Sequence, residues 1–580
     1  MFKRLAQCVR EYKIHTILTF IFIVCEVVIE VFLPFITADL IESIRKGAEM
    51  SEIIKTGVLL IVMAVLSLAC GGIAGVTCAK ASAGFAKNLR HDLFHKIQTY
   101  SFENIDKFSS SSLVTRMTTD VTNVQMSFMM IIRIAIRAPL MLVCAIIMAY
   151  IMGGALATSF VVVVPVLAFG LWLISRKAMP AFRAVFKKYD RMNESIEENV
   201  RGMRVVKGFS RENHEKEKFG AASENICMDF TKAERIVALN TPLMQICVNF
   251  NMIFVMLVGS QLVINSGGEL IGVGQMSAML TYGMQILIQL MMISMIYVML
   301  TISSESMKRI YEVLQESPAL TSPESPITEV KDGSIDFNGV SFKYSAKAEK
   351  AALANIDLHI KSGMTIGILG GTGSSKSTLV QLIPRLYDVT EGSVQVGGVD
   401  VREYEIESLR DSVAMVLQKN LLFSGTIKEN LRWGNENATD EQLIEACKLA
   451  QAHDFVSSFP DGYDTKIEQG GTNVSGGQKQ RLCIARALLK KPKILILDDS
   501  TSAVDTKTDM LIRGGFKKFI PETTKIIIAQ RVASVEDADM IIVMDNGGIS
   551  ATGTHTELLA SCDIYREIYQ QQTNGGGDNE

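Results

Sequence analysis

The stretch GILGGTGSSKSTLV, residues 367–380, decides the fold of the second half of the chain. It follows the phosphate-binding pattern G-x-x-x-x-G-K-[ST] at every fixed position but one. Gly370 opens the pattern and Lys376 and Ser377 close it, but Ser375 stands where the second glycine is expected. An apolar, strand-like run precedes the loop and a helix-like run follows it. This context predicts a site for ATP and Mg²⁺, because backbone N–H groups at the start of a helix cradle phosphate.

A second motif, KILILDDSTSAVD at residues 493–505, ends an apolar run at Asp498. A carboxylate there would hold Mg²⁺ through water, beside the Ser377 hydroxyl. Taken alone, the motif could equally be a buried strand that ends in an acidic turn, but its position downstream of a phosphate loop favours the Mg²⁺ site. Other β-rich runs alternate with helical stretches in this half, which predicts an α/β P-loop ATPase domain with a largely parallel sheet.

The first half of the chain is much more apolar. Of all 580 residues, 48% are hydrophobic and 21% charged, and the mean hydropathy is positive, which is rare for a soluble chain of this size. A helix needs about 20 mostly apolar residues to cross a bilayer. The sequence therefore predicts a polytopic α-helical membrane domain over residues 1–325, fused to the ATPase domain over residues 326–580. Its six transmembrane helices are expected at residues 14–36, 57–78, 128–151, 156–175, 242–264 and 276–302.

A proline-rich linker, QESPALTSPESPITEVKDG at residues 315–333, marks the boundary between the two domains. Lysine and arginine are frequent in the N-terminal tail and the long connections 80–123 and 176–238, and absent from 265–275. The positive-inside rule then places both termini and the ATPase domain in the cytoplasm of a multi-pass plasma-membrane protein. The net charge of −3 gives no basic bias toward nucleic acid, and ten scattered cysteines without a C-x-x-C pair indicate no disulfide framework or zinc site.

A third motif, VSGGQKQRLCIARAL at residues 474–488, decides between these interpretations. It resembles the L-S-G-G-Q signature of the ATP-binding cassette (ABC) transporters, with Val474 in place of leucine. Further residues resemble the family's Q-loop glutamine, adenine-stacking aromatic, exporter X-loop acid and D-loop: Gln418, Tyr344, Glu468 and residues 502–505. The resemblance implies that ATP is bound by Tyr344, Gly370, Gly371, Thr372, Gly373, Ser374, Ser375, Lys376, Ser377 and Thr378. It also implies Mg²⁺ contacts for Ser377, Gln418 and Asp498, and contacts to a partner chain's ATP for Ser475, Gly476, Gly477 and Gln478.

Six spans fused ahead of one ATPase domain resemble an exporter half-transporter of this family. The stretches FSSSSLVTRMTTDV, residues 108–121, and GMRVVKGFSREN, residues 202–213, resemble its two cytoplasmic coupling regions. In the family two such halves dimerise, and each ATP lies between the phosphate loop of one chain and the signature of the other. The resemblance therefore implies a translocase that couples ATP hydrolysis to export, surrounded by the lipid of a bacterial plasma membrane.

Three residues depart from the family pattern, all on the phosphate-loop side of the site. Asp499 stands where the family has the glutamate that polarises water, Gln530 stands at the switch-histidine position, and Ser375 replaces a glycine. Asp499 is one methylene shorter than glutamate, and a small misplacement of a catalytic group can cost orders of magnitude in rate. The Gln530 amide can donate a hydrogen bond but cannot titrate. We therefore expect weak hydrolysis at this chain's own site.

The signature, in contrast, is nearly intact. This asymmetry resembles the degenerate-site subunit of bacterial heterodimeric multidrug exporters, and it implies a homologous partner chain that carries the catalytic glutamate and the switch histidine. Two alternatives stay open. A lipid or peptide exporter is excluded by no feature of the sequence. A non-pumping ATP-gated channel or regulatory subunit is permitted by the missing catalytic groups, although the chain has no long regulatory insert.

Charged residues occur within two of the expected spans. Glu26 and Glu30 lie in the first, Arg133 and Arg137 in the third, and each pair is four residues apart, hence on one helix face. Charges at membrane depth are costly and usually pair or line water. They predict either a structural Glu–Arg ladder or a substrate cavity whose carboxylates attract cationic amphipathic molecules.

Two further polar pairs have spacings of four residues. Gln285 and Gln289 share one face of the last span, which indicates either the same cavity or polar packing between helices. His91 and His95 could hold a metal by their spacing, but no third ligand is evident in the sequence. We therefore expect no metal other than Mg²⁺.

Overall fold

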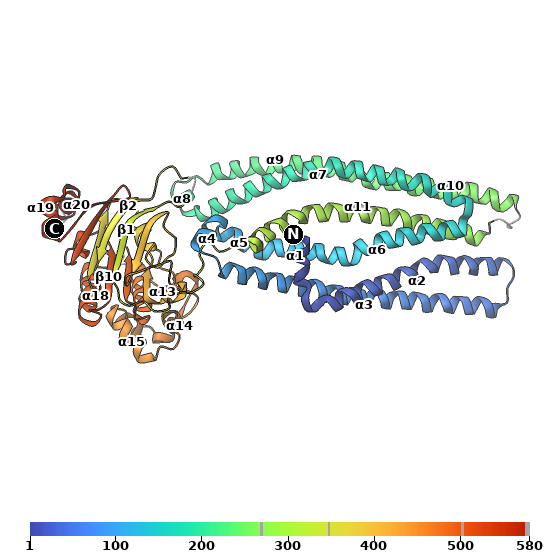
Figure 1. Ribbon diagram of the computed structural model, residues 1–580. Helices are drawn as coiled ribbons and strands as arrows, with labels where there is room; N and C mark the ends of the chain where they lie inside the picture. The colour runs from blue at the N-terminus through green and yellow to red at the C-terminus, as the bar shows by residue number, and fades with distance from the viewer. Residues whose placement is uncertain (267–270, 346–347, 500–503, 575–580) are drawn as a thin grey trace. The chain divides into compact units, whose positions relative to one another are not determined.

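The structure, a computed structural model, describes residues 1–266, 271–345, 348–499 and 504–574. The chain divides into two compact units, drawn in Figure 1. The helical unit comprises Met1–Thr99 and Ser109–Glu316, and the sheet unit comprises Ser317–Glu580 together with the separate segment Tyr100–Phe108. The sheet unit thus begins inside the proline-rich linker, a few residues before the expected boundary at residue 325.

Six helices in the described residues are long and apolar enough to span a membrane, as the apolar runs predicted. At 1.5 Å per residue, the 49-residue helix α3 is about 74 Å long. The hydrocarbon core of a bilayer is about 30 Å thick, so the helices continue well beyond it. The elements of this unit are α1 (Phe2–Ala6), η1 (Gln7–Tyr12), α2 (Lys13–Arg45), α3 (Met50–Gln98), α5 (Ser110–Thr115), η2 (Arg116–Asp120), α6 (Val121–Gly153), η3 (Gly154–Ala157), α7 (Thr158–Arg201), α8 (Met203–Gly208), α9 (Glu212–Ala238), α10 (Asn240–Asn265) and α11 (Val273–Gln315).

The apolar side chains of the helical unit face both inward and outward. Inside, Ile23 of α2 is fully buried in one cluster with Ala145 of α6 and Met279 of α11. Outside, large apolar residues stay exposed along the spans; Leu68 of α3 is 77% exposed. Such a surface is stable against lipid tails, and helices suit that environment because their backbone hydrogen bonds are satisfied internally.

The sheet unit is built on a six-stranded sheet in the order β12-β11-β3-β10-β9-β6. Neighbouring strands from β11 to β6 are parallel, and β12 is antiparallel to β11. Strands β9 and β10 are buried at every residue, as expected for a parallel sheet covered on both faces. The strands are β3 (Thr365–Gly370), β6 (Val413–Val416), β9 (Ile494–Asp498), β10 (Thr524–Ile528), β11 (Met540–Asp545) and β12 (Gly548–Gly553). The α/β expectation is therefore confirmed.

The remaining elements complete this unit. An antiparallel sheet in the order β2-β1-β4-β5 shares a buried core with one side of the first sheet, and β7 pairs with β8. The strands are β1 (Ile335–Phe342), β2 (Leu353–Ile360), β4 (Glu391–Val396), β5 (Val399–Asp400), β7 (Gly425–Thr426) and β8 (Lys466–Ile467). The helices are α4 (Phe102–Phe108), α12 (Lys376–Gln381), α13 (Ile406–Ser412), α14 (Ile427–Arg432), α15 (Asp440–Leu449), α16 (His453–Ser457), η4 (Gly462–Asp464), η5 (Gln469–Gly471), α17 (Gly476–Leu489), α18 (Thr506–Phe519), η6 (Val532–Ser534), α19 (His555–Ser561) and α20 (Asp563–Asn574).

The parallel order places the motifs at one edge. The phosphate loop follows β3, Asp498 ends β9, and Gln530 comes two residues after β10. Because β10 lies between β3 and β9 and all three run in the same direction, their carboxyl ends meet at a single edge of the sheet.

Helix α4 packs on the sheet unit, although it is inserted between the membrane helices in the sequence. The Tyr387 hydroxyl donates to Asp106 Oδ2 at 2.7 Å, and the rings of Phe102 and Tyr387 meet edge to face at 6.0 Å. Burial and the Asp106 carboxylate raise the pKa of Tyr387. Of the expected first coupling region, residues 108–121, Phe108 belongs to the sheet unit, and α5 and η2 belong to the helical unit.

Candidate functional site

The loop between β3 and α12 is folded back around Lys376. The ammonium group donates to the carbonyl oxygens of Gly370 at 2.9 Å and Gly371 at 2.8 Å, and to Ser374 Oγ at 3.3 Å. Ser374 is buried and donates to the Gly371 carbonyl oxygen at 2.8 Å. Partial burial lowers the pKa of Lys376, against the opposing pull of two nearby carboxylates. The Lys376 ammonium group thus hydrogen-bonds to neutral oxygens of the loop. The charged oxygens of a bound phosphate could take the place of these acceptors.

The structure shows why the phosphate-loop pattern has a glycine where this chain has Ser375. Ser375 has φ +68° and ψ +25°, a left-handed conformation that costs an L-residue about 1–2 kcal/mol. Gly373, two residues earlier, also has positive φ, at +86°. A Cβ atom on Gly370 would lie 2.2 Å from the Met544 carbonyl oxygen. The loop therefore keeps its expected shape, with strain at the substituted position.

Asp498 and Ser377 form the pair expected at the Mg²⁺ site. Asp498 is buried, and the Ser377 hydroxyl donates to its Oδ1 at 2.9 Å. Burial raises the pKa of Asp498, while the Ser377 hydrogen bond and Lys376 counteract this. A hydroxyl and a carboxylate side by side are the hard oxygen donors that Mg²⁺ prefers, so these residues fit the ion. Bound Mg²⁺ would neutralise charge on the phosphates.

Asp499 and Gln530, the two residues at the expected catalytic positions, contact each other. Gln530 Nε2 donates to Asp499 Oδ2 at 2.7 Å. The Asp499 N–H donates to the Ile528 carbonyl oxygen at 3.0 Å, and its φ is +49°, so its backbone is fixed in an uncommon conformation. This carboxylate accepts a hydrogen bond from a neutral amide at the place where the family uses a carboxylate and an imidazole.

Tyr344 contacts the middle and the C-terminal end of α12, whereas Asp498 contacts Ser377 near the start of this helix. Its hydroxyl is 2.9 Å from Thr378 Oγ1 and 3.5 Å from Gln381 Oε1. The ring is 48% exposed and is held edge to face by Phe342 and Tyr387, at 4.8 Å and 5.3 Å between centroids. The exposed part of this ring offers a surface on which an adenine base can stack.

The signature caps a helix. Ser475 Oγ accepts from the Gln478 N–H at 3.3 Å and Gln478 Oε1 accepts from the Ser475 N–H at 2.9 Å, a capping box at the start of α17. Gly476 and Gly477 form the first turn, and the 14-residue helix directs unpaired N–H groups out of its N-terminus. This end can therefore receive an anion.

Other expected residues are placed less tightly. Gln418 is exposed two residues after β6, next to β9 in the sheet, and its carbonyl oxygen accepts from Asn420 at 3.4 Å. Glu468 accepts from the Thr472 hydroxyl at 2.6 Å. Of the expected D-loop, residues 502 and 503 lie outside the described residues, and Asp505 caps α18 by accepting from the Thr508 N–H at 2.9 Å.

The polar residues expected in the spans line two cavities of the helical unit. One, of about 430 Å³, is lined by Glu30, Arg137, Gln285 and Gln289 among others. The other, of about 400 Å³, is lined by Glu26, Arg133, Arg137 and Gln289. Arg137 and Gln289 line both cavities, and all six expected residues line at least one.

Arg137 also forms the expected ladder. Its guanidinium lies 2.6 Å from Glu30 and 3.4 Å from Glu26, measured between nitrogen and oxygen. Glu26 fits because α3 has no side chain opposite it: a Cβ atom on Gly71 would lie 3.2 Å from this carboxylate. The ladder and the cavity are thus the same group of residues. Within the part of the chain that the structure describes, Arg133 pairs with no carboxylate.

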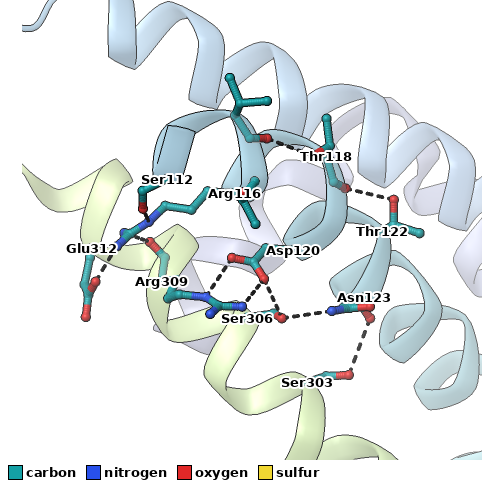
Figure 2. Close-up of polar contacts among 12 residues, drawn as sticks. Ser112, Arg116, Thr118, Asp120, Thr122, Asn123, Ser303, Ser306, Arg309 and Glu312 are labelled. Atoms are coloured by element: carbon teal, nitrogen blue, oxygen red, sulfur yellow. Dashed lines mark hydrogen bonds and ion pairs between the residues drawn. The ribbon is translucent and has the colours of Figure 1, made fainter. Parts of the chain in front are cut away.

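Figure 2 shows a polar network that the motifs did not indicate, where η2 meets α11. Asp120, fully buried in the π-helical turn η2, accepts hydrogen bonds from Ser306 Oγ at 2.8 Å and from two nitrogens of the Arg309 guanidinium. Arg116 in turn donates to the Arg309 carbonyl oxygen at 2.6 Å and contacts Glu312 at 3.2 Å. The network fastens α11, which leads into the linker, to the start of α6.

Known proteins resemble this chain over both of its units. Residues 16–303 match the family model described as the ABC transporter transmembrane region, and residues 353–502 match the one described as ABC transporter. The chain is 35% identical to the uncharacterized ABC transporter ATP-binding protein YfiB of Bacillus subtilis, with 97% of each chain covered. It is also 35% identical to the uncharacterized ABC transporter ATP-binding protein Rv1273c of Mycobacterium tuberculosis, with 98% of each covered.

The fold has a counterpart among solved structures. A bacterial Atm1-family ABC exporter with ATP bound superposes with a TM-score of 0.84 at 22% identity, covering 99% of each chain. At this identity the likeness concerns the fold. Together with the two matched regions, it supports ATP hydrolysis with Mg²⁺, coupled to transport across a plasma membrane.

Proposed function

The chain belongs to the ABC transporter family and has the exporter fold, and from this premise we propose that it is the degenerate-site half of a heterodimeric multidrug exporter. Its phosphate loop would mainly hold ATP, and its signature would complete a second, hydrolysing site on a partner. That partner is a homologous chain with the catalytic glutamate and the switch histidine. Both termini and the ATPase domain would face the cytoplasm.

The observation that carries this proposal is the hydrogen bond between Gln530 and Asp499. A catalytic base must be free to accept a proton from water within hydrogen-bond reach. Here the shortened carboxylate accepts from an amide at 2.7 Å, and the amide cannot take up a proton itself. Water activation at this site would therefore be weak, whereas Lys376, Ser377 and Asp498 supply the groups that would bind nucleotide and Mg²⁺.

The preserved signature supports the second half of the proposal. Ser475 and Gln478 form a capping box, and Gly476 and Gly477 leave the first turn open to close approach. If both sites of the assembly used this chain's Asp499 and Gln530, an intact signature would face only weak sites. A partner that supplies the missing groups gives the signature a hydrolysing site to complete.

The two cavities are the proposed substrate site. Arg137 lines both and contacts Glu30 of one and Glu26 of the other, and Gln285 Oε1 is buried without a hydrogen-bond partner among the described residues. Apolar linings that include Met129, together with these polar groups, suit an amphipathic molecule.

The test is the composition of the complex. A tag on this chain is used to purify it from its own membrane, and native mass spectrometry gives the mass and identity of what accompanies it. A one-to-one complex with a homologous chain that has glutamate and histidine at the two positions supports the proposal. A complex of this chain with itself refutes the heterodimer. ATP-dependent uptake of a fluorescent amphipathic cation into inverted vesicles tests the multidrug part separately.

A further inference from the structure

The C-terminal helix α20 holds the loop that carries Gln530. Gln572 makes two hydrogen bonds to this loop: its Nε2 donates to the Gln530 carbonyl oxygen at 2.8 Å, and its Oε1 accepts from the Val532 N–H at 2.8 Å. One side-chain amide thus satisfies a backbone acceptor and a backbone donor on either side of Arg531. We propose that Gln572 is a positioning residue of the nucleotide site, which fixes this loop so that the Gln530 side chain stays at Asp499.

Helix α20 is anchored firmly enough to serve this purpose. Tyr565 is fully buried, and its hydroxyl lies 2.6 Å from His555 Nδ1. Ile568 and Tyr569 pack against the core cluster that also contains Val532. The loop and the helix are therefore attached to one core, and the amide of Gln572 bridges them where both reach the surface.

A chain of contacts leads from Gln572 to the phosphate loop. Gln572 holds the Gln530 backbone, the Gln530 side chain donates to Asp499, and Asp499 follows Asp498, which accepts from Ser377. Tyr344 is held instead by Thr378 and Gln381 of α12. A loosened loop should therefore disturb recognition of the terminal phosphate and leave recognition of the base unchanged. This inference rests on the ATP site proposed above.

ATP has a terminal phosphate that ADP lacks. Comparing the affinities of the two nucleotides therefore tells whether Gln572 positions Gln530 or only stabilises the domain. A residue that merely stabilises the domain affects both affinities alike. A residue that positions Gln530 changes the affinity for ATP and leaves the affinity for ADP unchanged. Its effect must also vanish once the Gln530 side chain is gone, because residues acting through one another are not additive.

The experiment measures nucleotide affinity at this chain's own site in the full-length complex in lipid nanodiscs. Photolabelling with 8-azido-ATP on ice marks the chain that binds the base, and the labelled band of this chain is competed with ATP or with ADP. Gln572→Ala should weaken ATP binding about three- to tenfold, as expected for two lost hydrogen bonds. The affinity for ADP should change less than about twofold. The matched control is Gln571→Ala, because Gln571 donates at 3.3 Å to Glu567 of the same helix; it should match the parent protein.

A cycle with Gln530 completes the test. Gln530→Ala should weaken ATP binding by a similar factor. The double variant Gln530→Ala/Gln572→Ala should bind ATP no more weakly than Gln530→Ala alone. Equal ATP affinity in the Gln572→Ala and Gln571→Ala proteins, or a parallel loss of ATP and ADP affinity, would overturn the inference while leaving the ATP site intact. Failure of the parent protein to label would overturn the ATP site and this inference together.

Discussion

The carboxylate of Asp120 gives a prediction whose size can be worked out from the structure. Asp120→Ala removes a fully buried acceptor of three hydrogen bonds, one from Ser306 and two from Arg309 (Figure 2). Removing one partner of a buried ion pair costs about 3–5 kcal/mol. The Arg309 side chain is 46% exposed, however, and can turn to water. We therefore expect a loss of about 2–3 kcal/mol.

That loss should lower the melting temperature of the purified full-length protein by about 3–5 °C, because the unfolding entropy grows with size and the helical unit has about 300 residues. Thermal melting followed by circular dichroism at the helical minimum measures it. Asp120→Asn, which keeps the shape but not the charge, should fall between Asp120→Ala and the parent protein. The control is Glu305→Gln, an exposed carboxylate one residue before Ser306. If Asp120→Ala and Glu305→Gln shift the melting temperature equally, the network does not fasten α11 to α6 as argued.

Three further predictions concern the nucleotide site and the Glu–Arg ladder. Asp499→Glu combined with Gln530→His should raise ATP hydrolysis at this chain's site at least about tenfold, and an unchanged turnover in purified complex would contradict the account of the weak site. Ser375→Gly relieves left-handed strain of about 1–2 kcal/mol and adds about 0.5–1 kcal/mol of backbone entropy cost; the melting temperature should rise slightly, and a fall would show that Ser375 is not strained. Arg137→Met leaves the carboxylates of Glu26 and Glu30 without their cation, so the yield of monodisperse protein should drop severely. Adding Glu30→Gln should recover part of that yield, and no recovery would exclude the ladder.

The positions of four candidate residues of the nucleotide site follow from the sheet topology. Lys376, Ser377 and Gln530 come after strands of a parallel sheet and Asp498 ends one, and the carboxyl ends of parallel strands meet at one edge. Local spacing therefore determines their neighbourhood. The spans were predictable for a similar reason, because the length of an apolar run is set by the thickness of the bilayer.

The contacts that escaped the sequence join distant segments. Asp120 and Arg309 are 189 residues apart, and Asp106 and Tyr387 are 281 apart. Helical periodicity tells which residues share a face, but not how far two long helices are rotated or shifted against each other. Arg137 could be predicted to need a carboxylate and to line a cavity, yet the sequence could not show that one guanidinium does both.

Tyr387 has a thermodynamic consequence. Its ring packs edge to face with that of Tyr344, and its hydroxyl donates to Asp106 in the segment between two membrane helices. Linkage is symmetric: if nucleotide at Tyr344 favours one placement of that segment, the same placement strengthens nucleotide binding by an equal factor, commonly about 5–150-fold for coupled sites. If the transported molecule also favours one placement of that segment, it and ATP are effectors of each other. The coupling free energy can be measured from either side, as a shift in ATP affinity when substrate is added or in substrate affinity when ATP is added, and the two values must agree.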